Sequence, residues 1–149
     1  MPTLGEIEDA ILARLAPLKG THGVRTLDSY DTRLEDPEAW KRFGIQFPAV
    51  FVAYEGFDNV DKGSRQVAMH RYQIGVADQA LRWKEARRGA VGNGGAYALI
   101  DGVRDILAGV CVLPRLLPAM PKGGKVAFVR TDASMYVLTY SIGEPYLIP

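Results

Sequence analysis

A regular alternation of side chains runs through Gln66-Val67-Ala68-Met69-His70-Arg71-Tyr72-Gln73-Ile74-Gly75-Val76-Ala77-Asp78. An extended chain would place Ala68, His70, Tyr72, Ile74 and Val76 on one face and Arg71 and Gln73 on the other. One apolar face and one polar face are typical of a half-buried strand in an antiparallel sheet. We therefore predict a long β-strand over residues 66–78.

The segment before this strand is apolar on both of its faces. After Pro48, one face would carry Val50, Val52 and Tyr54, and the other Ala49, Phe51 and Ala53. A strand of this kind is expected at the centre of a sheet, with both sides covered. Residues 56–64 are rich in Gly, Asp, Asn and Ser, so they are expected to form the turn that leads into the long strand.

Three further strands are predicted by their side-chain patterns. The first covers residues 24–30. The other two, at residues 125–131 and 135–142, form a terminal hairpin through Asp132-Ala133-Ser134, followed by a proline-bounded tail. Pro114, Pro118 and Pro121 are expected to exclude regular structure before this hairpin, because proline donates no backbone hydrogen bond.

Two amphipathic helices complete the pattern. The first has a capping box at Thr3 and Glu6, an apolar stripe, and breakers at Pro17 and Gly20. The second runs from Ala96 to Val110, with Asn93 as its expected N-cap and Gly109 as its expected stop. The predicted fold class is α+β: a mainly antiparallel sheet with two helices packed on one face, in a single domain over residues 1–149.

Composition limits the classes of function. The chain has 149 residues, of which 48% are hydrophobic and 23% charged, as in ordinary globular proteins. Its single cysteine, Cys111, excludes an internal disulfide and is expected to be a buried structural thiol. No segment approaches the ~20 apolar residues of a membrane helix, and no signal-peptide core opens the chain. We therefore expect no membrane association and no ordinary secretory export.

Charge is divided unevenly along the chain. Residues 1–61 contain 11 acids and 6 bases, a net charge of −5, whereas residues 62–149 contain 6 acids and 12 bases, a net charge of +6. Such a division can guide association between oppositely charged faces of neighbouring copies. The alternative is an unremarkable scatter of charge over a solvated surface.

The sequence offers little catalytic or metal-binding chemistry. His22 and His70 are the only histidines, and neither has a second ligand at the spacing of a metal site. A core or interface role is expected for His70, and surface turn roles for Asp28 and Asp31. The glycine-rich segment 89–95 lacks the Gly-Lys-Ser/Thr ending of a phosphate-binding loop. We therefore predict no enzyme activity, no catalytic residue, no metal and no cofactor.

A long basic segment, residues 81–95, separates the long strand from the second helix. Its interaction residues are predicted to be Arg82, Trp83, Lys84, Arg87 and Arg88, and its flexible hinge Gly89, Gly92, Gly94 and Gly95. The cations and the indole could bind a nucleic-acid backbone. Alternatively, they could dock on an acidic neighbouring chain. We favour the neighbouring chain, because a net charge of +1 provides no broad basic face.

Three phrases, in order, resemble a known family. They are residues 7–15 (IEDAILARL), residues 47–56 (FPAVFVAYEG) and Arg88-Gly89-Ala90-Val91-Gly92 leading into residues 96–100 (AYALI). Together they resemble the virion proteins that Mu-like phages and prophages encode just before the tail sheath. That family looks like tail terminators, and its expected architecture of a small sheet with packed helices agrees with the fold predicted above.

The resemblance implies a structural role in the virion tail or neck, after assembly in the bacterial cytoplasm. The expected form is a ring of identical copies, a hexamer, that caps the tail tube. Its expected partners are the tube and sheath proteins and the head–tail connector, with DNA passing through the ring. Two alternatives stay open: a head–tail neck or completion protein, and a small ligand-binding domain that uses the glycine-rich segment.

Overall fold

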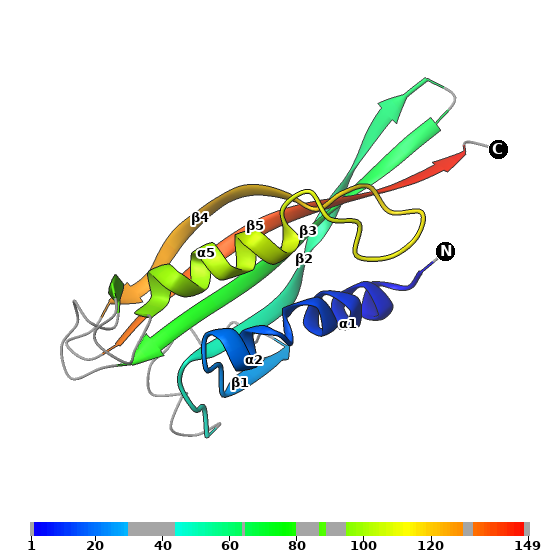
Figure 1. The fold of residues 1–149 in the computed structure, drawn as a ribbon. Helices are drawn as coiled ribbons and strands as arrows, with labels where there is room; N and C mark the ends of the chain where they lie inside the picture. The colour runs from blue at the N-terminus through cyan, green and yellow to red at the C-terminus, as the bar shows by residue number, and fades with distance from the viewer. Residues whose placement is uncertain are drawn as a thin grey trace.

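A computed structural model describes residues 2–29, 44–63, 65–79, 87–88, 95–129 and 133–147. Its elements are α1 (Leu4–Leu15), α2 (Leu18–Thr21), β1 (Thr26–Ser29), β2 (Ala49–Lys62), β3 (Arg65–Gln79), α5 (Gly95–Leu107), β4 (Met120–Val129) and β5 (Ala133–Leu147). The strands form a five-stranded sheet in the order β1-β2-β3-β5-β4 (Figure 1). The predicted α+β class is confirmed.

The sheet is antiparallel except at one edge. β3 pairs antiparallel with β2 on one side and with β5 on the other, and β4 pairs antiparallel with β5. β1 is the exception, because it runs parallel to β2 over Ala49–Val52. The long alternating strand predicted from residues 66–78 is thus β3, at the centre of the sheet.

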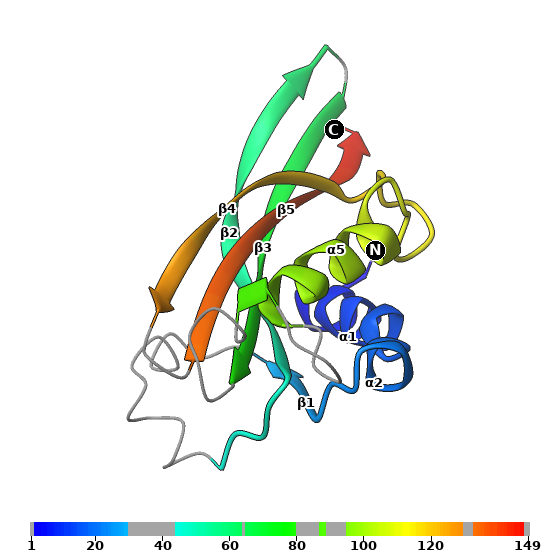
Figure 2. The same cartoon turned by 60° about the vertical axis from the view of Figure 1, so that its left-hand side comes forward.

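The helices cover one face of the sheet, as predicted (Figure 2). Ile7, Ile11 and Leu15 of α1 belong to the same buried core as Leu99 and Val103 of α5. From the sheet, this core receives Val50, Val52, Tyr72, Ile74, Val76, Leu138, Tyr140 and Ile142. The opposite face has a smaller cluster of Ala49, Phe51, Ala77, Ala133, Met135 and Val137. The first half of β2 is therefore buried on both sides, as its sequence predicted.

The expected turn over residues 56–64 is wrong for most of its length. β2 continues to Lys62, and its pairing with β3 runs from Phe57 opposite His70 to Lys62 opposite Arg65. The register shifts between Tyr54 and Gly56, as at a β-bulge. Pairing with β3 satisfies the backbone of this Gly- and Asp-rich segment and outweighs its preference for turns.

Proline also interrupts less of the chain than expected. β4 already begins at Met120 and includes Pro121, and β5 continues through Pro145 instead of ending in a loose tail. β4 is the last strand in the sheet order, and its pairing with β5 reaches no further than Ser141. Both prolines therefore lie where a missing backbone donor is tolerated.

The helix ends follow their local signals. The Thr3 side chain accepts from the Glu6 backbone N–H at 3.1 Å, and Glu6 Oε2 accepts from the Thr3 backbone N–H at 2.8 Å, so the capping box is confirmed. The first helical segment is divided into α1 and α2 around Pro17. α5 ends at Leu107, three residues before the predicted end, and Gly109 follows with φ 76°.

The start of α5 involves a residue that the sequence reading did not select. Asn93, the expected N-cap, lies outside the described residues. The carboxylate of Asp78, at the end of β3, accepts a hydrogen bond from the backbone N–H of Gly95, the first residue of α5. This contact from the sheet satisfies one of the unpaired donors at the helix start.

The expectation of a buried thiol is wrong. Cys111 is exposed, although its neighbour Val112 is buried. Arg14 Nη2 donates to the backbone carbonyl of Cys111 at 3.3 Å, beyond the end of α5. The apolar run that contains this cysteine crosses the surface, so its side chains alternate between the core and water.

Candidate assembly site

The basic segment is described in part. Arg87, Arg88 and Gly95 lie within the described residues, and the other predicted residues lie outside them: Arg82, Trp83, Lys84, Gly89, Gly92 and Gly94. Gly95 is buried and has φ 72°, a conformation that glycine adopts with little cost. Arg88 is exposed, whereas Arg87 is half-buried.

Arg87 binds two tyrosines of its own chain. Its Nε donates to the Tyr136 hydroxyl at 2.8 Å, and its Nη2 donates to the Tyr97 hydroxyl at 2.8 Å. The guanidinium carbon lies 5.6 Å from the centroid of the Tyr97 ring, within cation–π range. The two rings meet edge to face, with centroids 5.8 Å apart. Arg87 therefore joins the basic segment to α5 and β5.

These contacts change the acidity of the groups involved. The hydrogen bond to Tyr136 raises the pKa of Arg87. The hydrogen bond with Tyr136, together with the positive charge of Arg87, lowers the pKa of Tyr97. Burial raises the pKa of Tyr136. Arg87 remains a cation at the boundary between α5 and β5, and its charge is oriented by the two phenols.

A groove opens beside this cluster, between α5 and the edge of the sheet. Its volume is about 400 Å³, and it is lined by Ile100 and Arg104 of α5, by Pro121, Gly123, Gly124, Lys125 and Val126 of β4, and by Tyr136, Leu138 and Tyr140 of β5. Arg104 and Lys125 are exposed, and Asp101 Oδ1 lies 3.6 Å from Arg104 Nη1. The groove combines an aromatic and aliphatic floor with two cations. We call it the cationic groove.

A second surface is formed where the sheet extends beyond the helices. Figure 1 shows the β2–β3 hairpin projecting past α1 and α5, with the end of β5 beside it. We define the arm as residues 57–62 of β2, residues 65–70 of β3 and residues 142–147 of β5, which pair in this order. Phe57 is 52% exposed on it and Val60 is 37% exposed. By register, Phe57 lies on the same face of the sheet as His70, and Val60 lies on the opposite face.

The two faces of the arm differ in charge. Register places Phe57, Asn59 and Asp61 on the face that continues the helix-covered side of the sheet, together with Glu144. The other face carries Asp58 and Arg65, and the Asp58 carboxylate contacts the guanidinium of Arg71, the residue that follows the arm on β3. Within the described residues, the charged side chains on the helix-side face of the arm are therefore acidic.

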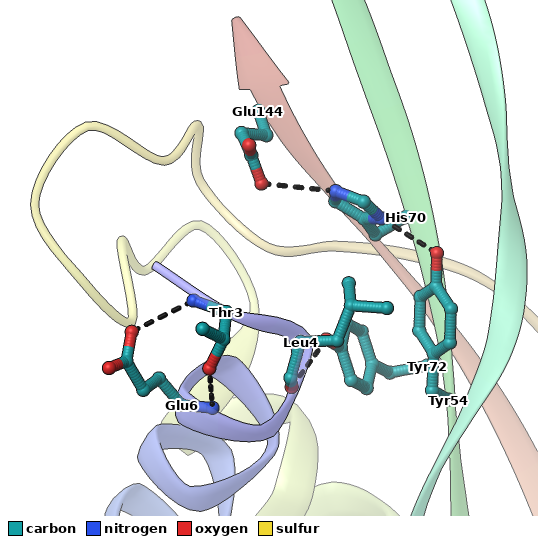
Figure 3. A network of polar contacts seen from close by, with 7 residues as sticks. All are labelled: Thr3, Leu4, Glu6, Tyr54, His70, Tyr72 and Glu144. Carbon is teal, nitrogen blue, oxygen red and sulfur yellow. Dashed lines mark hydrogen bonds and ion pairs between the residues drawn. The ribbon is translucent and has the colours of Figure 1, made fainter. Parts of the chain in front are cut away.

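A chain of polar contacts centred on the buried His70 holds the base of the arm (Figure 3). His70 is 6% exposed; its Nδ1 lies 2.9 Å from the Tyr54 hydroxyl and its Nε2 lies 3.2 Å from Glu144 Oε2. An ionised carboxylate can only accept, so in the neutral imidazole Nε2 donates a hydrogen bond to Glu144 and Nδ1 accepts a hydrogen bond from the Tyr54 hydroxyl. Burial raises the pKa of Tyr54, so its phenol keeps that proton. These contacts give His70 a core position, as its strand pattern predicted.

The remaining candidate residues are separated. His22 lies in the turn after α2, where its Nδ1 is 2.7 Å from the Thr21 hydroxyl, and Asp28 is exposed on β1. Tyr30 and Asp31 lie outside the described residues. Among the described residues, no three His, Cys, Asp or Glu side chains come close enough to hold a metal ion. In the same part of the chain, each helix is too short or too polar to cross a bilayer.

The sequence reading missed the arm and the groove for a physical reason. The groove is built from three elements, and the Tyr54–His70–Glu144 chain joins residues 16 and 74 positions apart. Neither arrangement leaves a local spacing in the sequence. The available signal was the pair of large apolar residues, Phe57 and Val60, within a segment expected to form a polar turn.

The projecting arm and the cationic groove are two separate surfaces of this α+β fold. The chain belongs to the family described as Bacteriophage Mu, Gp37, whose model matches residues 3–132. This match confirms the resemblance to Mu-like phage proteins and indicates a structural protein of the phage virion. No curated protein matches the chain.

Proposed function

We propose that this protein is a tail terminator, which closes the growing end of the tail tube as a ring and then provides the surface to which the head is joined. The observation that carries the proposal is the family match over residues 3–132. Under this proposal its partners are sister copies, the tube and sheath proteins and the head–tail connector, and DNA passes through the ring.

A closed ring needs two different surfaces on each copy. In a head-to-tail contact, one patch of a subunit meets another patch of the next. The arm and the cationic groove are separate surfaces, and the uneven division of charge along the sequence supports contacts of this kind. A terminator must also bind the end of a polymer without being extended by another tube subunit, which requires faces of unlike chemistry.

Electron microscopy of particles made without this chain tests the proposal. A lysogen of the parent phage that lacks the chain should produce tails of irregular length on induction, and expression of the chain in trans should restore uniform length. Finished tails of normal length beside unjoined heads would contradict a terminator role and favour the neck or completion protein.

The copy number is a separate part of the proposal. Native mass spectrometry of the chain with tube protein should give six copies for each tube end. A screen of thermal stability against nucleotides and divalent metals should give no large shift. A strongly stabilising ligand would instead favour the small ligand-binding domain, because a ligand that binds the folded state raises its stability.

A further inference from the structure

We infer that the helix-side face of the arm of one copy docks in the cationic groove of the next copy. This inference rests on the proposed ring, because it specifies the contact between adjacent subunits. It assigns Phe57 and Asp61 of the arm to a site lined by Arg104 and Lys125 of another copy.

The arm has the properties of the inserting partner. Phe57 is 52% exposed, although its ring is tilted against the His70 ring at a centroid distance of 5.8 Å. Asp61 is exposed on the same face, near the tip of the hairpin. The Tyr54–His70–Glu144 chain fixes the base of the arm, so docking would require little ordering of the backbone.

The groove has the complementary properties. Tyr136, Leu138 and Tyr140 provide an apolar floor on which an aromatic side chain can pack. Arg104 and Lys125 provide positive charge beside that floor, and Arg87 lies next to it on Tyr136. Gly123 leaves the β4 wall open, because a Cβ at this position would have no neighbour within 4 Å, so another backbone can approach closely there. At Gly124 the Leu138 side chain of the same copy fills that space.

Geometry favours a contact between copies over one within a copy. Figure 1 and Figure 2 show the arm extending away from α5 and β4, which form the groove. An arm of one copy therefore meets the groove of another in a head-to-tail contact. If the rotation between copies closes, repetition of this contact produces a ring.

Charge favours a second copy over nucleic acid. Nucleic-acid binding requires several cations along a phosphate backbone, and its affinity falls steeply with salt. The groove has two cations among its lining residues, and Asp101 lies 3.6 Å from one of them. An aromatic side chain followed four positions later by a carboxylate matches a short groove with an apolar floor and a cationic rim.

Mixed disulfide formation tests the contact directly. Both partners carry Cys111→Ser, because the natural thiol is exposed. One partner also carries Asn59→Cys on the arm and the other carries Val126→Cys in the groove wall. Mild oxidation of the mixture should give a heterodimer at least about tenfold in excess of either homodimer, since each oriented contact places unlike cysteines together. A yield equal to that of the homodimers would overturn the inference.

Charge reversal provides a second, independent test of the contact. Lys125→Glu and Asp61→Lys should each lower the yield of the mixed disulfide, and the two changes on opposite partners should restore it. Lys19→Glu, at an exposed position of α2, is the matched control and should leave the yield unchanged. Circular dichroism confirms that each variant is folded. Failure of the double reversal to restore the yield would contradict the pairing of Asp61 with Lys125.

Added duplex DNA shows whether the groove binds the arm of another copy or nucleic acid. The mixed disulfide should form equally well with and without duplex DNA. Suppression by DNA, together with DNA binding that Lys125→Glu abolishes, would overturn the inference and assign the groove to nucleic acid. Cross-linking requires no tail tube, so its failure is distinguishable from a failure of the terminator role, which is measured by tail length.

Discussion

The Tyr72 hydroxyl, on the central strand β3, donates a hydrogen bond to the Leu4 carbonyl in the first turn of α1 at 3.2 Å. The Tyr72 residue has no exposed surface, and burial raises the pKa of its phenol. Water therefore cannot replace this contact without entering the core. One buried hydroxyl thus joins the centre of the sheet to the start of the first helix (Figure 3).

Replacement of Tyr72 by phenylalanine should lower the free energy of unfolding by about 1 kcal/mol, the usual net value of a buried hydrogen bond. Urea denaturation at neutral pH measures the loss. Tyr140→Phe is the matched control, because Tyr140 is also buried but makes no side-chain hydrogen bond to another described residue. Equal losses in the two variants would show that the bond to Leu4 does not stabilise the fold.

Asp78 should make stability depend on pH. Burial raises the pKa of its carboxyl, while hydrogen bonds from the Gln79 and Gly95 backbone N–H groups lower it in part. The folded chain thus holds this proton more strongly than the unfolded chain, in which the pKa of an aspartate carboxyl is about 3.9. Protonation of Asp78 therefore contributes to the free energy of unfolding. This contribution is complete below about pH 4 and is lost as the pH rises through the raised pKa.

Asp78→Asn should remove that dependence, because the amide oxygen can still accept from both backbone donors but does not ionise. The slope of unfolding free energy against pH above about pH 4 should become flatter than in the parent chain. The exposed Asp101→Asn is the control and should leave the slope unchanged. An unaltered slope in Asp78→Asn would show that the buried carboxyl does not cause the effect.

His70→Leu should loosen the arm more than the body of the fold. It leaves the Tyr54 hydroxyl and the Glu144 carboxylate without their shared partner, at a cost of about 1–3 kcal/mol. Hydrogen exchange should accelerate in residues 57–70 and stay slow in α5. Met69→Leu changes a half-buried neighbour on the other face and should have little effect on the arm. Uniform acceleration over both regions would contradict a local anchor.

The part of the fold that was predicted correctly depends on local or strictly periodic signals. The capping box needs only Thr3 and Glu6, and the buried face of β3 follows from a period of two. The second helix was also predicted to within a turn, since its apolar stripe is strong. Such signals are contained within one element, so they survive without knowledge of the tertiary structure.

The errors arose where tertiary contacts outweigh local preference. Residues 57–62 have a composition typical of turns, but β3 supplies a complete pairing partner for them. Cys111 follows an apolar pattern, yet the chain leaves the core immediately after α5. The role of Arg87 depends on Tyr97 and Tyr136, and no local spacing indicated that these side chains would meet.

Within the basic segment, Arg88 should affect assembly and Arg87 should also affect local structure. Arg87→Glu and Arg88→Glu together should impair assembly onto tail tubes while the fold persists. Arg88→Glu alone should also impair assembly, but it should leave the free energy of unfolding unchanged, because Arg88 is exposed. Arg87→Glu should also release Tyr97 and raise its pKa, as measured by ultraviolet titration. Unchanged tail length and infectivity in the double variant would remove this segment from the mechanism.

Two helical glycines should respond oppositely to alanine. A Cβ on Gly102 of α5 would lie 2.9 Å from His22 Cε1 and 3.0 Å from Leu18 Cδ2, whereas a Cβ on Gly20 of α2 would have no neighbour within 4 Å. Leu18 is buried, and the His22 ring is hydrogen-bonded to the Thr21 hydroxyl, so neither side chain can easily move away from an added Cβ.

Gly102→Ala should therefore lower the free energy of unfolding by about 1–3 kcal/mol through overpacking, despite the higher helix propensity of alanine. Gly20→Ala should raise it by up to about 1 kcal/mol, because alanine loses less backbone entropy on folding. Parallel urea titrations measure both changes. Stabilisation by both substitutions would contradict the close packing of Gly102 against Leu18 and His22.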